Sequence, residues 1–262
     1  MKYLNSVFFL LFVICFGHIY GQSDTIYADE KDHYISKDKF YEKINSPIYY
    51  GMRFDMDTVV LQKIRFKYYL GSLPPTVKSQ LHKLLNKRHQ IDTTKTLVIH
   101  YTDTLKSATE FAKRSKVIYR DSLNNIVSIP DSGSFIDFNK IRTIKKHEHI
   151  WSYKEYINQH KKCVKSHQKY EEVVSVLHFY NHNNGHPDEV KNVKWFQDYG
   201  SIIKKIFADS YKNFQQIIIY PNGDFFIQAM GNNIPYEDLM RKRNWDNHKD
   251  DFLEKVKLLN AI

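Results

Sequence analysis

Beyond Leu61, apolar and polar positions alternate as far as Leu70. A period of two with charges on one face predicts a half-exposed strand near a sheet edge, which ends at Gly71. The apolar face holds Ile64, Phe66, Tyr68 and Leu70, and the opposite face holds Lys63, Arg65, Lys67 and Tyr69. Pro74 and Pro75 then open a helix, because proline suits the first helical turn. The buried positions of that helix are Val77, Leu81, Leu84 and Leu85.

Further strands are predicted by runs that are apolar on both faces. Residues 96–102 and 173–180 have this pattern, which is typical of central strands. Residues 216–220 and 224–229 flank Pro221-Asn222-Gly223, and Asn-Gly between apolar runs predicts a β-hairpin. Two shorter strands are predicted at residues 117–120 and 126–129.

Helices are predicted by capping residues and by amphipathic spacing. Ser107 with Glu110 forms a capping-box pattern that predicts a helix to about Lys116, and Ser152 with Glu155 predicts another to about His167. The apolar stripe of the second helix is Tyr153, Tyr156, Ile157, His160 and Val164. A third helix carries Trp195, Phe196, Tyr199, Ile202, Ile203, Ile206 and Phe207, and a last one covers residues 236–259 with a break near 245–247.

Strands that alternate with helices predict an α/β fold, with a mixed sheet flanked by helices and a C-terminal β-hairpin and helix. Over residues 96–258 this order resembles the thioredoxin-like fold, with an insert at about 117–170. Two features of that family are missing. Tyr101-Thr102-Asp103-Thr104-Leu105 stands where the Cys-x-x-Cys motif belongs, and Asn213-Phe214-Gln215 stands where a proline precedes the hairpin. The resemblance therefore implies a scaffold without redox activity.

The N-terminus has the pattern of a secretory signal peptide. Lys2 precedes an apolar run over residues 7–16, and Gly21 is a small residue suited to cleavage before Gln22. An uncleaved membrane anchor is the alternative. The Gly-Gln junction resembles the signal peptides of exported Bacteroidota proteins. We therefore expect a signal peptide at 1–21, an N-terminal lead-in at 22–57, a single α/β domain at 58–262, and a secreted or periplasmic location without a transmembrane segment after cleavage.

Composition narrows the classes of function. The chain has 262 residues, 9 Gly, 7 Pro and a net charge of +10, so collagen-like and low-complexity classes are excluded. Basic residues are scattered in short groups, which disfavours nucleic acid and leaves an anionic envelope component or a protein as the partner. After signal cleavage Cys163 is the remaining cysteine, so an internal disulfide is excluded and we expect a buried packing role for it.

The densest group of functional side chains follows the second central strand. His182, His186 and Asp188 are candidate Zn²⁺ ligands, with His178 at the strand end as the next candidate. A solvated turn is the alternative interpretation of this loop. No Walker A, Gly-x-Gly-x-x-Gly or His-Glu-x-x-His motif is present, and no cofactor other than Zn²⁺ is indicated.

Two other groups of residues are candidates for chemistry. His100 and His178 occupy equivalent places in the two central strands and would lie side by side if those strands were paired in register. On the helix after Ser152, the spacing of His160, Cys163 and His167 suits either one metal ion or core packing. The leading hypothesis is an exported α/β protein with a non-catalytic binding or structural role. The alternative is a metal-dependent hydrolase that uses the 178–186 loop, and no catalytic residue is assigned.

Overall fold

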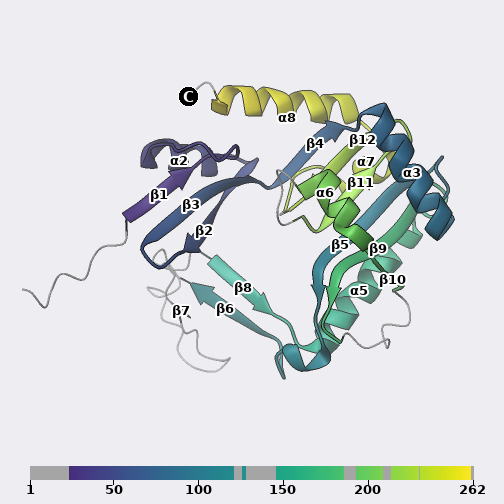
Figure 1. Cartoon of the computed structure of the whole chain (residues 1–262), viewed down its shortest axis with the longest axis horizontal. Coiled ribbons are helices and arrows are strands. Elements are labelled where there is room, and N and C mark those ends of the chain that lie inside the picture. The colour runs from purple at the N-terminus through teal and green to yellow at the C-terminus, as the bar shows by residue number, and fades with distance from the viewer. Residues whose placement is uncertain are drawn as a thin grey trace, which may run out of the picture. The chain divides into compact units, whose positions relative to one another are not determined.

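The structure is a computed structural model that describes residues 24–120, 126–127, 146–185, 193–208, 214–229 and 231–260 (Figure 1). It divides into two compact units. The first combines Met1–Lys67 with Lys257–Ile262, and the second is Tyr68–Val256. The expected signal peptide at 1–21 lies outside the described residues. The division falls after Lys67 rather than at the predicted boundary of 57/58, and the first unit takes in the C-terminal end of the chain.

The strands are β1 (Asp24–Ala28), β2 (Tyr49–Asp55), β3 (Val59–Phe66), β4 (Tyr68–Ser72), β5 (Thr96–Leu105), β6 (Lys116–Arg120), β7 (Ile126–Val127), β8 (Lys146–Ile150), β9 (Val174–Asn183), β10 (Trp195–Gln197), β11 (Gln216–Ile219) and β12 (Asp224–Gln228). The helices are α2 (Lys37–Ile44), α3 (Pro75–His89), α5 (Tyr153–Gln168), α6 (Ile202–Ala208), α7 (Tyr236–Arg241) and α8 (Trp245–Asn260). Short 3₁₀ turns cover Ala108–Glu110 and Tyr199–Ser201.

The first unit contains a three-stranded sheet in the order β1-β3-β2, with β1 parallel and β2 antiparallel to β3. Ser36 caps α2 by accepting a hydrogen bond from the Lys39 N–H. Phe40, Ile48 and Tyr49 are fully buried. The described part of the segment expected as an N-terminal lead-in, 22–57, thus supplies β1, α2, β2 and part of a core.

Charged side chains are buried inside this first unit. Lys43 Nζ donates to Glu30 Oε2 at 2.8 Å and to Asn260 Oδ1 at 2.8 Å, and the Tyr49 hydroxyl donates to Glu30 Oε1. Lys63 and Arg65 on β3 are also buried, and Lys63 forms an ion pair with Asp32. The sequence predicted these two side chains on an exposed face. The prediction is wrong for this strand, because β3 is the central strand of its sheet and Lys63 meets Asp32 from the turn after β1 instead of facing solvent.

The second unit contains a six-stranded mixed sheet in the order β10-β9-β5-β11-β12-β4. β10, β9 and β5 are parallel, whereas β11, β12 and β4 pair antiparallel to their neighbours. The predicted mixed sheet flanked by helices is confirmed, as are the central place of β5 and the hairpin of β11 and β12. The strand predicted over residues 61–70 is divided in two, because it ends at Phe66 as β3, the central strand of the first unit's sheet, and resumes at Tyr68 as β4, an edge strand of the second unit's sheet. The resemblance to the thioredoxin-like fold stays a prediction.

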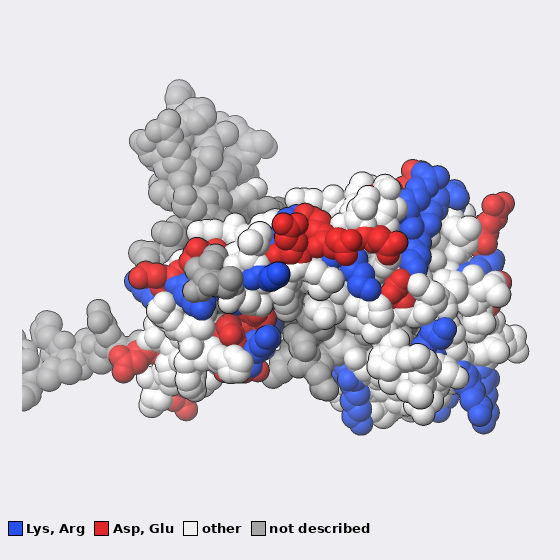
Figure 2. All heavy atoms as spheres, turned by 90° about the horizontal axis from the view of Figure 1, so that it is seen from above, with Lys and Arg blue, Asp and Glu red and all other residues white. Residues whose placement is uncertain are grey.

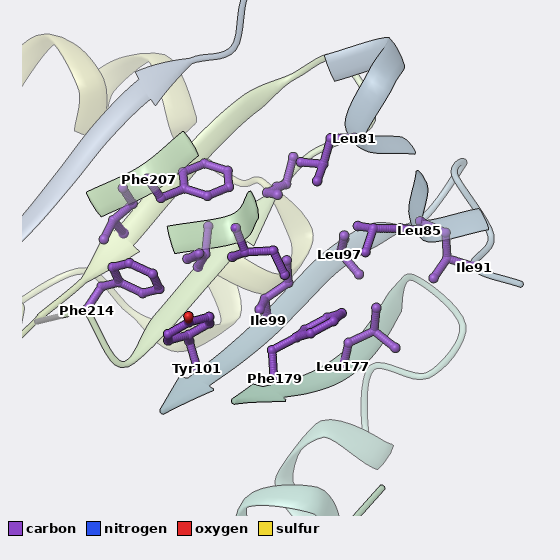
Figure 3. Packing of buried hydrophobic residues seen from close by; sticks show 14 residues of the cluster. Leu81, Leu85, Ile91, Leu97, Ile99, Tyr101, Leu177, Phe179, Phe207 and Phe214 are labelled. Atoms are coloured by element: carbon purple, nitrogen blue, oxygen red, sulfur yellow. The ribbon is translucent and has the colours of Figure 1, made fainter. Parts of the chain in front are cut away.

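One face of this sheet packs against α3 and α6 in an apolar core (Figure 3). Leu81 and Leu85 from α3 and Phe207 from α6 meet side chains of four strands. The strands contribute Leu97, Ile99, Tyr101, Leu177, Phe179, Ile217, Ile219 and Ile227. Because successive strand residues point to opposite faces, the residues between these positions project to the other side of the sheet.

On that other side the pairing register sets a polar row across five strands. Trp195 pairs with His178, His178 with His100, His100 with Gln216, and Gln216 with Gln228. Directly paired residues project to the same face. The side chains of α5 and α7 contact this face through the cluster described below. α5 begins as predicted, with Ser152 Oγ accepting from the Glu155 N–H at 3.3 Å.

One helix prediction is wrong, and a second is right only for its C-terminal part, where α6 covers Ile202–Ala208. After Ser107 the chain makes only the Ala108–Glu110 turn, because Phe111 is extended (φ −89°, ψ 153°) and Ala112 forms a bridge to Ser152. Trp195 and Phe196 lie in β10 rather than in a helix, because that segment pairs with β9 at the sheet edge. Among the described residues, no helix has both the length and the apolar composition needed to cross a bilayer.

Candidate functional site

Parallel pairing of β5 and β9 brings two histidines together on the α5 side of the sheet. His100 and His178 are direct partners in the register. Their rings are stacked, with centroids 4.9 Å apart and planes inclined by 21°. The sequence predicted this pair on the condition that the strands were neighbours in register, and the structure confirms the pairing.

Helix α5 adds a thiol and a third imidazole above His100. Cys163 Sγ lies 3.5 Å from His100 Nε2 and 3.8 Å from His167 Nδ1. The ligand-type atoms of these three residues all lie within 4.8 Å of one another. Cys163 and His167 are four residues apart on the helix, so they project from one face on successive turns. We refer to His100, Cys163 and His167 as the His₂Cys cluster.

These separations match those expected around one metal ion. Zn–S bonds of about 2.3 Å and Zn–N bonds of about 2.0 Å that meet at a tetrahedral angle place sulfur and nitrogen about 3.5 Å apart. Both sulfur–nitrogen distances in the cluster are within a few tenths of an ångström of that value. The cluster therefore fits a transition-metal ion with little rearrangement.

The hydrogen bonds of His167 define its present tautomer. Nδ1 lies 2.8 Å from the Cys163 carbonyl oxygen, which can only accept, so Nδ1 carries the proton and donates it. Nε2 accepts from the Tyr236 hydroxyl at 2.5 Å. Tyr236 begins α7, far from His167 in the sequence, and the sequence analysis did not identify it. Its position fits that of an outer partner that orients a ligating imidazole.

Burial keeps every member of the cluster neutral at pH 7. Burial beneath α5, followed by the neighbouring charges of His178, His167 and His160, holds the pKa of His100 well below its usual value. Burial also lowers the pKa of His167. It raises the pKa of the Cys163 thiol. Neutral imidazoles are ready to coordinate a metal, whereas the thiol must lose its proton on binding.

His160 and Trp195 border the His₂Cys cluster. The ring of His160 lies 5.4 Å from that of Trp195 and 6.4 Å from that of His178. The sequence grouped His160 with Cys163 and His167, but among the described residues it is His100 that completes the compact set. The core-packing interpretation of Cys163 is half right, because the side chain is partly buried but faces two imidazoles rather than apolar groups.

The predicted loop site is only partly described. His182 is exposed, and its Nε2 accepts from Asn181 Nδ2 at 3.0 Å. His178, by contrast, is buried, with 5% of its surface exposed, and its ring stacks on that of His100. His186 and Asp188 lie outside the described residues, so the metal site at this loop, and the hydrolase that depends on it, stay predictions.

A cavity of about 420 Å³ opens beside the cluster, between α5 and the β9–β10 edge. His167 and His178 line it together with Val164, Val174, Val176 and Phe196. Imidazoles with lowered pKa values in a mainly apolar hollow are typical of a binding site. On the face drawn in Figure 2, Lys and Arg lie in groups separated by acidic and neutral surface, so that face carries no continuous basic stripe.

Comparison of the chain with models of known protein families, with curated proteins and with solved structures gives no match.

Proposed function

We propose that this protein binds a transition-metal ion, in the first place Zn²⁺, through His100, Cys163 and His167. The observation that carries the proposal is the convergence of one thiol and two imidazole nitrogens within 4.8 Å of one another. Zn²⁺ is commonly held by this mixture of sulfur and nitrogen donors. We further propose that the protein acts outside the cytoplasm, as its N-terminal pattern predicts, in a binding rather than a redox role.

Metal binding requires His167 to exchange the proton on its ring. Nδ1 faces Cys163 Sγ but now donates to the Cys163 carbonyl. Coordination through Nδ1 moves that proton to Nε2, and a small turn of the ring directs the Nδ1 lone pair at the metal. The Tyr236 hydroxyl, which donates to Nε2 in the present arrangement, then accepts from it. A hydroxyl can play both parts, so the same partner orients the ring in both states.

The proposal is tested by titrating the purified, chelator-treated protein with Zn²⁺ against a competing chelator. We expect one ion per chain with a Kd below about 10 μM, which corresponds to roughly −7 kcal/mol. Cys163→Ser and His167→Gln should each weaken binding by at least about 100-fold, beyond the 10- to 100-fold effect typical of changes around a metal shell. His182→Gln, on the exposed end of β9, is the matched control and should bind as the native protein does. Binding weaker than 10 μM, or binding that survives loss of the thiol, contradicts the proposal.

A further inference from the structure

His178 is a buried imidazole without a partner for one of its nitrogens among the described residues. Its side chain is only 5% exposed, and its Nε2 is buried without a hydrogen bond. Leaving a buried polar atom unpaired costs about 1–3 kcal/mol, so native proteins almost always satisfy such atoms. An unpaired nitrogen at this place indicates that a group bound in the functional state is its missing partner.

The described side chains around His178 leave this nitrogen unsatisfied in the present structure. Its ring meets the Trp195 ring edge-on at 5.2 Å between centroids, and the Trp195 Nε1 is itself buried without a partner among the described residues. On its other side His178 stacks on His100, which belongs to the His₂Cys cluster. A group bound by His100 would therefore lie next to the His178 ring.

The His₂Cys cluster has one ligand fewer than a closed zinc site. Three protein ligands leave one tetrahedral position of a Zn²⁺ ion unfilled, and structural zinc sites fill all four. His178 projects from the same face as His100, one strand away and directly in register, on the side that α5 covers. The backbone of His178 lies next to that of His100, and to reach the cluster its ring would have to turn out of the stacked position.

We infer that His178 is the fourth ligand of the metal site, so that the ion is held by Cys163 and three histidines in a closed shell. The inference rests on the proposed metal binding and specifies its kind. A closed shell holds the ion firmly and offers no position for water or substrate. It thus favours a storage, transfer or structural role for the ion over hydrolysis.

The native protein gives the first test. It is loaded with Co²⁺ and its visible spectrum is recorded with and without a large excess of azide, which binds at open coordination positions. We expect an intense four-coordinate spectrum with a thiolate charge-transfer band, unchanged by azide. X-ray absorption of the Zn²⁺-loaded protein should show one sulfur and three imidazoles. A spectrum altered by azide, or a shell with only two imidazoles, overturns the inference while leaving the proposed metal binding intact. Absence of Co²⁺ and Zn²⁺ binding overturns both.

Paired variants give the second test. His178→Phe keeps a ring of similar size but removes the ligand, and we expect metal affinity to fall about 100-fold and azide to change the Co²⁺ spectrum. His160→Phe is the matched control, because His160 lies next to the same ring on α5, and should leave affinity and azide response unchanged. If His160→Phe weakens binding and His178→Phe does not, His160 is the fourth ligand and the inference is wrong.

Discussion

At the scale of single residues, the imidazoles beneath α5 combine burial with proximity. Burial is the first cause that lowers the pKa values of His100, His167 and His178, and for His178 it lowers the value to about 4. Protonation of these buried, adjacent histidines destabilises the folded state. The same feature that prepares them to coordinate a metal therefore makes the metal-free protein sensitive to acid.

This sensitivity has a definite sign. In the unfolded chain histidine takes up its proton near pH 6.5, whereas folded His178 does so only near pH 4. The stability contributed by neutral His178 is present above pH 6.5 and is lost as the pH falls toward 4, because the unfolded state binds the proton first. Between pH 7.5 and 5.5, His178 alone should lower the free energy of unfolding of metal-free protein by about 1.4 kcal/mol.

Urea unfolding at the two pH values, in the presence of a chelator, measures this effect. His178→Phe removes the titrating group and keeps a ring, so its stability should fall by about 1.4 kcal/mol less over the same interval. Equal pH dependence in the two proteins would show that His178 is protonated as easily in the folded state as in the unfolded chain.

At the scale of elements, the β11–β12 hairpin illustrates how a local sequence determines a turn. Pro221 and Asn222 are the central residues of a turn closed by the Gly223 N–H donating to the Tyr220 carbonyl at 2.8 Å. Gly223 follows with φ 96°, in the left-handed region that glycine adopts at little cost. The predicted hairpin is present, but its loop has three residues and ends in a left-handed glycine, a common form of short hairpin.

Gly223→Ala should therefore destabilise the protein by about 1–2 kcal/mol, because an L-residue is strained in this region. The one tight contact of the added Cβ is with the flexible Lys78 side chain, at 3.0 Å from Cδ, and the Leu73 carbonyl oxygen lies at an ordinary 3.6 Å, so backbone strain is the main cause. Gly231→Ala is the matched control, because a Cβ added at Gly231 has no atom within 4 Å. This substitution should change the free energy of unfolding by less than about 0.5 kcal/mol. Urea unfolding measures both, and equal effects of the two variants contradict the assignment of strain to Gly223.

At the scale of the whole molecule, the chain closes its first unit with residues from both ends. Asn260 Oδ1 accepts from Lys43 Nζ, which also pairs with Glu30 in the buried network. The expected processing event lies upstream of this unit, since β1 begins at Asp24 and the predicted cleavage precedes Gln22. Removal of residues 1–21 would therefore leave β1 in the mature chain.

We accordingly expect the mature protein to begin at or near Gln22, and intact-mass spectrometry of native material measures the start directly. The expectation rests on Lys2, on the apolar run over residues 7–16 and on Gly21. A native species that retains Met1 to Gly21 contradicts cleavage, and with it the proposal of a secreted or periplasmic protein.

The sequence by itself determined the features that depend on neighbours along the chain. Strict alternation, continuous apolar runs, the Ser152 cap and Asn222-Gly223 predicted every strand of the main sheet except β10, together with α5 and the hairpin, because each depends on local backbone preference and periodicity. Only tertiary structure decided the rest. Lys63 and Arg65 are buried although alternation placed them on an exposed face, and Lys63 meets Asp32, a residue that is distant in sequence. Trp195 is in a strand because β9 offers it an edge. The His₂Cys cluster joins residues 63 positions apart in sequence, His100 and Cys163. The neighbouring pair of His100 and His178 depends on the register in which β5 and β9 pair. A spacing of four along α5 indicated Cys163 and His167 as neighbours, but spacing carries no information about which strand residue lies beneath a helix.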